Sequence, residues 1–449
     1  MIKTMAHSKG STLRTVLLLY ALLLFAVLTS CASNPRAYAK IDEKVQHGEF
    51  DEAVAALDAR RKVRGTIYSA RNNLLFYLDR GMVLHYADRF SPSFTDLHNA
   101  ERLIEEAFTR SITQEIGTFL LNDNVREYRG EDYEDLYINV FNALNFHGQN
   151  NLESALVEIR RMNEKLNVLA DRYQRAARRV VESNEHLDPR QLPIESSRFS
   201  NSALARYMGV LFHRARGNPD SARIDHQELL QAFRLAPNIY NHPIPSSIQH
   251  ELSIPPDMAR LNVIAFTGLS PIKVERNILI PLPFAFPNNS ARIAIPVMIE
   301  RAQTVTRTEV LLSSGQSFRL ELLENMSAVA METFKSSQGL TILKTSARVI
   351  TKAAASAIAA QRTRREQGDG LGLLAGALGR VLTEVSESAD IRISRYFPSR
   401  ALVGGINVPP GTYTVTVNFY GRSGLIMSES STIQIQTNSL NLLRFVCPR

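Results

Sequence analysis

The sequence lacks the short motifs that mark several common catalytic sites. It contains no His-Glu-x-x-His, no Gly-x-Ser-x-Gly, no P-loop and no dinucleotide fingerprint. Ser270 and Lys273 spell Ser-x-x-Lys, the nucleophile pair of penicillin-interacting enzymes, but no Lys-Thr-Gly follows. Pro271 and the β-like run after it predict a strand edge rather than the helix start that this chemistry needs. The sequence therefore predicts no catalytic residue, no cofactor and no metal site.

The sequence also has little excess charge. The net charge is +8, and it falls to +5 without the three cations Lys3, Lys9 and Arg14 near the N-terminus. The remaining basic residues are interleaved with acids, so a nucleic-acid partner is not expected. A hydrophobic fraction of 44% and a charged fraction of 21% are those of an ordinary globular chain that can bury a core.

No acidic residue precedes Cys31. The three cations are followed by an apolar run, residues 16–27, and by the tetrad Leu28-Thr29-Ser30-Cys31. A basic region, a short apolar region and small residues before a cleavage site predict a secretory signal over residues 1–30. The alternative is a transmembrane anchor, because the uncharged stretch 15–34 is long enough to span a bilayer.

The tetrad resembles the lipobox of bacterial lipoproteins. That resemblance implies that Cys31 is lipidated with fatty acyl chains such as palmitate and becomes the mature N-terminus. Residues 31–36 then form a short tether, and the lipid makes the membrane a partner. Ala32 rather than Asp follows the cysteine. In a host cell with two membranes, the resemblance therefore favours the outer membrane, with the chain facing the periplasm.

Only one other cysteine, Cys447, is present. If Cys31 carries lipid, Cys447 has no intrachain partner, so no disulfide is expected in this exported chain. Cys447 ends an apolar run from Asn441 and is predicted to be a small buried side chain in the last strand.

Residues 37–240 show a helical pattern, with apolar residues three and four apart and few prolines as far as Asp188. The stretch 48–53, Gly-Glu-Phe-Asp-Glu-Ala, resembles the middle of a tetratricopeptide repeat (TPR), in which a Gly turn joins two helices and a small Ala lets them approach. Three weaker copies occupy 81–100, 143–162 and 217–237. The alternative is a plain helical bundle.

Polar residues interrupt the repeats between the second and third copies. Asn, Asp and Asn at 122–124 are good turn and cap residues, and the acids at 131–135 fit the first turn of the next helix. The functional alternative is a polar recognition loop that binds an envelope protein along the repeat surface. A calcium site fits poorly, because the spacing is not that of an EF-hand. The candidate binding residues are Asn122, Asp123, Asn124, Tyr128, Arg129, Glu131 and Asp132.

Taken together, the mature chain resembles a family of bacterial tetratricopeptide-containing lipoproteins of unknown function. The resemblance implies the architecture and export, but no activity. It is carried by Leu78-Asp79-Arg80-Gly81, Leu84-His85-Tyr86, Asn122-Asp123-Asn124, Tyr128 to Glu134, Ala155-Leu156-Val157-Glu158 with Arg160-Arg161, and Pro409-Pro410-Gly411-Thr412-Tyr413.

Prolines cluster over 241–257 and predict an extended linker between two domains. After it, alternating apolar and polar residues predict a strand-rich domain, 258–449, of the antiparallel β-sandwich type. A helical insert, 321–390, is expected inside this domain, with one helix over 321–338 and another over 340–365.

Gly368, Gly372 and Gly376 in this insert are four residues apart, a spacing that lets two helices come close. One interpretation is a helical hairpin packed on the sheet. The other is a hairpin that lies on a membrane or self-associates with another subunit.

We therefore predict an α+β multidomain protein: a TPR-like helical solenoid followed by a β-sandwich-like domain with a helical-hairpin insert. The main functional hypothesis is a membrane-anchored scaffold for protein–protein interaction. The alternative is an envelope enzyme or cell-wall-polymer-binding factor with a site formed by residues 122–135 and the C-terminal domain. A concave, exposed repeat face would favour the scaffold. A pocket that joins Asp123, Arg129 and Glu131 to C-terminal groups would favour the alternative.

Overall fold

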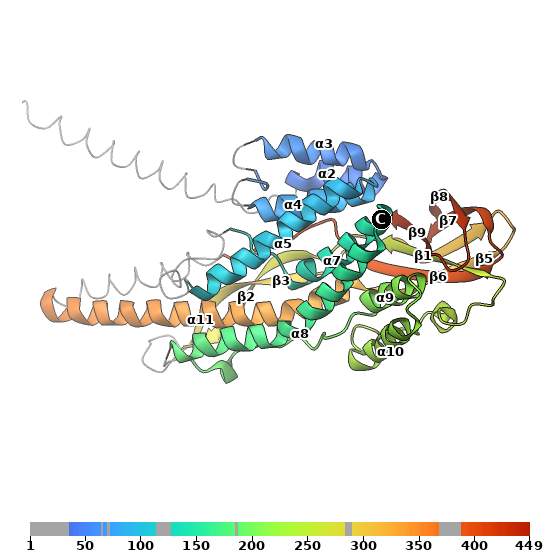
Figure 1. The fold of residues 1–449 in the computed structure, drawn as a ribbon. Helices are drawn as coiled ribbons and strands as arrows, with labels where there is room; N and C mark the ends of the chain where they lie inside the picture. Colours follow the sequence, from blue (N-terminus) through green and yellow to red (C-terminus); the bar gives the residue numbers. More distant parts are fainter. Residues whose placement is uncertain are drawn as a thin grey trace, which may run out of the picture. The chain divides into compact units, whose positions relative to one another are not determined.

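The computed structural model describes residues 36–63, 66–69, 72–113, 127–184, 187–282, 290–367 and 388–449. The chain divides into two compact units, 1–40 and 41–449. Helices and a large sheet make up the second unit (Figure 1), so the predicted α+β fold class is confirmed. Cys31, Asn122, Asp123, Asn124, Gly368, Gly372 and Gly376 lie outside the described residues.

The described helices before residue 240 form four helix–turn–helix pairs. In chain order the pairs are α2 (Arg36–His47) with α3 (Phe50–Arg61), α4 (Asn73–Tyr86) with α5 (Phe90–Thr113), α7 (Asp132–Gly148) with α8 (Leu152–Glu182), and α9 (Ala203–Ala215) with α10 (Pro219–Leu235).

The turn of each pair contains one residue with a positive φ: Gly48 (78°), Asp88 (56°), Asn150 (58°) and Gly217 (72°). In each turn the next amide donates to the carbonyl five residues back, at 2.8 to 2.9 Å. This bond defines the Schellman cap, which satisfies carbonyls at the end of a helix and reverses the chain. The four turns share this geometry, and each falls within one of the four predicted repeat copies.

Small residues let the paired helices touch. Ala53, Ala100 and Ala155 have no exposed surface. A Cβ atom on Gly81 of α4 would lie 2.8 Å from Leu97 Cδ2 of α5, so a larger residue would require the Leu97 side chain to move. Ala53, which is predicted to lie where the first two helices touch, is completely buried.

Seven described strands form one mixed sheet in the order β8-β7-β4-β5-β6-β1-β9. β1 and β9 run parallel, and the other neighbouring pairs are antiparallel. The edge strands β8 and β9 contact each other, so the twisted sheet is nearly closed rather than split into the two layers of the predicted sandwich. Its strands are β1 (Ala259–Thr267), β4 (Arg307–Leu312), β5 (Ser317–Asn325), β6 (Arg400–Val408), β7 (Gly411–Gly421), β8 (Gly424–Ile435) and β9 (Asn441–Cys447).

Apolar side chains fill the inside of this sheet. Val263, Val310, Val417 and Phe419 are completely buried there. Cys447 belongs to the same core with no exposed surface, which confirms its prediction as a buried side chain of the last strand. Burial raises the pKa of its thiol to about 11.

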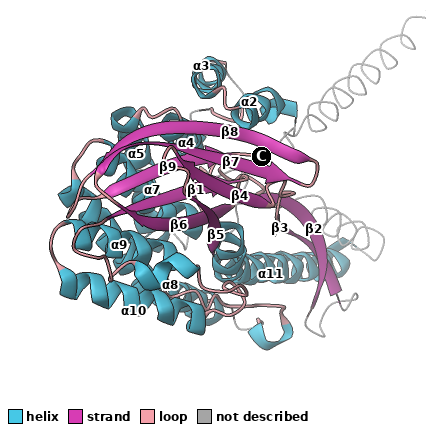
Figure 2. Ribbon diagram, turned by 90° about the vertical axis from the view of Figure 1, so that its right-hand side faces the viewer, coloured by secondary structure: helices cyan, strands magenta, loops and turns pink. Residues whose placement is uncertain are grey.

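Two further strands, β2 (Ile272–Pro281) and β3 (Ser290–Ile299), pair as a separate antiparallel ribbon. Figure 2 shows this ribbon beside α11 (Met326–Gln367). One stripe of α11, with Ile342 and Val349, packs on the ribbon, and the adjacent stripe, with Leu343 and Ile350, packs against the end of α8. The ribbon and α8 are thus joined through one helix.

The helical insert differs from its prediction in two ways. Residues 317–325 form strand β5, so the helix begins at Met326 rather than at Glu321, and it runs as one helix to Gln367 without a break near 339. The apolar residues of 317–325 fit a strand as well as a helix, and the pairing with β6 decides the outcome. None of the helices in the described ranges combines the length and apolarity that a bilayer crossing requires.

The segment 241–257 also differs from the predicted linker. Residues 246–250 form a short 3-10 helix in which Ile248 is 1% exposed, and Glu251 has no exposed surface. Glu251 contacts side chains of α9 and β1. The segment is packed between the helices and the sheet, and both regions belong to one compact unit.

Candidate functional site

The N-cap and first turn of α7 carry two of the predicted binding residues, Glu131 and Asp132. Gly130 has a φ of 81° and ends the loop before the helix. Glu131 is the N-cap, and its amide donates to Glu134 Oε2 at 2.8 Å in a capping box. Asp132, Glu134 and Asp135 follow in the first turn, where the helix dipole favours anions. The predicted position of these acids is confirmed.

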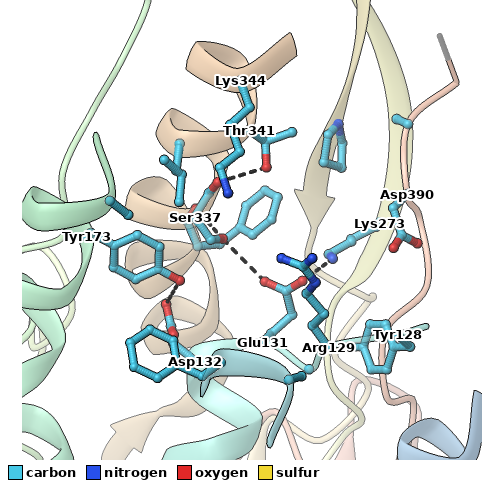
Figure 3. A pocket seen from close by; sticks show the side chains of 18 of the residues that line it. Tyr128, Arg129, Glu131, Asp132, Tyr173, Lys273, Ser337, Thr341, Lys344 and Asp390 are labelled. Carbon is cyan, nitrogen blue, oxygen red and sulfur yellow. Dashed lines mark hydrogen bonds and ion pairs between the residues drawn. The ribbon is translucent and has the colours of Figure 1, made fainter. Parts of the chain in front are cut away.

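Glu131 extends from the helix start toward the β2–β3 ribbon. Its carboxylate forms an ion pair with Lys273 of β2 and accepts a hydrogen bond from Ser337 Oγ of α11 at 3.4 Å. Figure 3 shows Glu131 between these two partners. The Glu131 and Lys273 side chains are only 10% and 4% exposed. Burial raises the pKa of Glu131, and Lys273 counteracts part of that effect.

Asp132 points to the opposite wall, which α8 provides. Tyr173 donates its hydroxyl hydrogen to Asp132 Oδ2 at 2.7 Å. Burial raises the pKa of Asp132 to about 7, while Arg172 and the Tyr173 hydrogen bond oppose the shift and the Glu131 and Asp135 carboxylates add to it. Asp132 therefore changes charge near neutral pH, the range in which an acid–base group is most useful.

These groups line a pocket of about 200 Å³ between α7, α8, the ribbon, α11 and residues 388–390. Both signs of charge are present, and hydroxyl groups lie between them (Figure 3). Such a lining can bind a ligand that itself carries a cation, an anion and hydroxyl groups. Its charged side chains include Arg129, Arg172, Lys273, Lys344, Glu131, Asp132 and Asp390.

A largely buried strap, residues 388–399, brings Asp390 to this pocket. The Ser394 amide donates to Glu134 Oε1 at 2.7 Å, and the Arg395 amide donates to Asp79 Oδ1 at 2.8 Å. Burial raises the pKa of Asp79 to about 6 and that of Glu134 to about 8, while these hydrogen bonds act in the opposite direction. Two buried carboxylates thus fix the strap on the helical region.

Four of the predicted binding residues line the pocket: Tyr128, Arg129, Glu131 and Asp132. Tyr128 also donates its hydroxyl hydrogen to Glu134. Sequence reasoning did not identify Tyr173, Ser337 or Asp390, and it considered Lys273 only in the Ser-x-x-Lys pattern. The structure places Lys273 near the start of β2, so the predicted strand edge is confirmed. Ser270 Oγ donates a hydrogen bond to the Ser394 carbonyl at 2.8 Å.

Within the described ranges, no group of three or more His, Cys, Asp or Glu side chains is arranged to hold a metal ion. Comparisons of the chain with protein-family models, with curated proteins and with solved structures find no match. The function must therefore be inferred from the pocket itself.

Proposed function

We propose that this chain is a bacterial envelope lipoprotein, anchored through acylated Cys31, whose mixed-charge pocket binds a cell-wall polymer. The signal and the lipobox-like tetrad support export and anchoring, with the body facing the periplasm. Cell-wall glycopeptides carry amino, carboxyl and hydroxyl groups together. The pocket offers carboxylates, basic groups and hydroxyls in one lining, so the chemistry of the two matches.

The buried Glu131–Lys273 pair carries this proposal. Burying an ion pair costs desolvation energy, and apolar side chains of similar size often stabilise a fold equally well. Here the pair lies in a pocket wall, and it joins the 127–135 insert to the C-terminal ribbon. Charged groups that line a cleft and have perturbed pKa values are typical of functional sites.

The four helical hairpins support the finer classification as a TPR-like region. They share one turn geometry, and small residues lie at their contacts. We propose that they are divergent repeats with insertions, as in the lipoprotein family that the sequence resembles.

A protein scaffold is the second candidate function. Val157 and Val168 on α8 are 42% and 59% exposed, and Ile224 and Leu235 on α10 are 56% and 51% exposed. Each pair is eleven residues apart, which places its members on the same face of a helix. These exposed apolar side chains could contact a partner protein without involving the pocket.

The double variant Glu131→Gln/Lys273→Met tests the pocket. It removes both charges together, so neither is left buried alone, and Gln keeps an acceptor for the helix cap. We expect stability within about 1.5 kcal/mol of the parent, but at least a roughly tenfold loss of binding. The measurement is co-sedimentation of the full chain, in neutral detergent, with isolated peptidoglycan.

The matched control is Asp171→Asn/Arg175→Gln, which removes an ion pair on α8 whose side chains are 59% and 58% exposed. It should bind like the parent. Equal binding by both double variants would contradict the pocket proposal.

The pKa of Asp132 predicts opposite pH dependences for binding and stability. The folded-state pKa of about 7 lies above the ordinary 3.8, so the stabilisation is fully present below pH 4 and is lost as pH rises through 7. Binding of a ligand amine should instead strengthen by about tenfold from pH 6 to 8 as the carboxylate ionises. Melting temperatures and co-sedimentation in the same buffers test this. Asp132→Asn should remove the rise in binding, whereas Asp171→Asn should not.

A further inference from the structure

A second cavity lies where the residues after β1, residues 301–304 and the β7–β8 turn meet. Its volume is about 800 Å³. The described residues that line it include no acidic side chain, in contrast to the mixed-charge pocket. Its basic residues are His47, Arg301, Arg422 and Arg449.

Arg301, in the lining of this cavity, has side-chain nitrogens that lack a hydrogen-bond partner. Its Nε and Nη2 atoms are buried without a hydrogen-bond partner. Burial lowers the pKa of Arg301, and nearby Arg395 lowers it further, while Asp42 acts in the opposite direction. Asp42, however, already pairs with Arg395 and accepts a hydrogen bond from Tyr396 at 3.0 Å. Guanidinium nitrogens that are buried without a hydrogen-bond partner are unfavourable unless a ligand supplies an acceptor.

Gln303 adds an unused acceptor to the same wall. Its Nε2 donates to Ser399 Oγ at 2.7 Å, but its buried Oε1 has no donor. Gly268, with a φ of 67°, leaves room for this side chain, because a Cβ atom there would lie 2.5 Å from Gln303 Oε1. The wall therefore offers guanidinium groups for an anion and, beside them, an acceptor for a hydroxyl group.

We propose that this cavity binds the phosphate group of a glycerol-phosphate-type ester, with Arg301 and Arg422 on the phosphate oxygens and Gln303 on a neighbouring hydroxyl. One guanidinium satisfies both oxygens of a carboxylate, whereas a phosphate has enough oxygens and charge for two. A soluble phosphate ester and a glycerophospholipid headgroup share this chemistry. The site is separate from the mixed-charge pocket, so it does not depend on the function proposed for that pocket.

Isothermal titration of the full chain, in neutral detergent, with sn-glycerol 3-phosphate and with dihexanoyl phosphatidylglycerol tests the proposal. Binding of the first ligand alone indicates a soluble ester, and binding of the second indicates a lipid headgroup. Glycerol, which lacks the phosphate, should not bind. Arg301→Gln should weaken binding by at least about tenfold, since hydrogen bonds to charged groups are involved.

If Arg301→Gln folds poorly, Arg422→Gln still tests the site, because Arg422 lies on an exposed turn. The Arg422→Gln change should weaken binding about fivefold. The control Arg319→Gln changes a β5 side chain that is 68% exposed and paired with Glu309, and it should bind like the parent. The proposal is overturned if neither phosphate ligand binds, or if Arg422→Gln binds as tightly as the parent.

Discussion

Replacing Glu251 with alanine is expected to lower the free energy of unfolding by roughly 3–5 kcal/mol, the usual effect of removing one partner from a buried ion pair. Its side chain is completely buried. Arg260 Nη2 donates to Oε1 at 3.0 Å, Asn262 donates to both oxygens at 2.9 Å, and Arg214 pairs with Oε2. Without the carboxylate, two guanidinium groups in the interior lose their shared anion.

The midpoint of urea unfolding of the full chain measures this effect. Glu153→Ala is the matched control, because Glu153 is 79% exposed in its pair with Arg216, and exposed pairs contribute at most about 1 kcal/mol. Glu251→Gln keeps the volume and one acceptor, so its midpoint should fall between those of the parent and Glu251→Ala. If Glu251→Ala and Glu153→Ala shift the midpoint equally, the 241–257 segment does not connect the helices to the sheet through Glu251.

The helical region was largely predictable because its determinants are local. A helix end, a residue that tolerates positive φ and a small residue at the contact all lie within a few positions of one another. Gly48 and Asn150 could therefore be assigned to turns from the sequence alone. Asp88 could not, because aspartate occurs as often on exposed helix faces and its neighbours do not distinguish the two.

The sheet was less predictable because its pairings are distant. Val263 of β1 pairs with Gly404 on one side and with Leu443 on the other. Nothing near Val263 in the sequence specifies either partner, so strands could be predicted but their order could not. Distant pairing also explains why 241–257 was predicted as an extended linker. The sequence around Glu251 does not reveal that Arg214 and Arg260 pair with it.

The pocket contains some residues that the local sequence identified and others that only the fold brings together. Arg129, Glu131 and Asp132 stood out because polar residues cluster in the insert before α7. Lys273 and Ser337 were missed because each looks like an ordinary residue of a strand or a helix, and only the fold brings them to Glu131. A site assembled from distant segments leaves no motif in the sequence.

Glu324→Ala is expected to destabilise the chain by a similar amount, roughly 3–5 kcal/mol, for a different reason. Glu324 is a completely buried carboxylate at the bulge that ends β5. It accepts hydroxyl hydrogen bonds from Tyr240 at 2.6 Å, Tyr137 at 2.7 Å and Ser202 at 2.9 Å, and the Leu204 amide donates to it at 3.2 Å. Alanine leaves these buried donors unsatisfied, at about 1–3 kcal/mol each before relaxation.

The donors come from α7, from the start of α9 and from the chain after α10, so Glu324 connects three helical segments to the sheet through one side chain. Glu324→Gln keeps one acceptor oxygen but turns an amide toward the hydroxyls, and it should cost about 2 kcal/mol. Arg319→Ala, in the same strand but 68% exposed, should cost less than about 1 kcal/mol. Urea unfolding of the three variants measures the order. A Gln variant as unstable as the Ala variant would show that the retained oxygen contributes nothing. An Ala variant as stable as Arg319→Ala would refute the role of Glu324, because buried donors that lose their acceptor cannot be neutral.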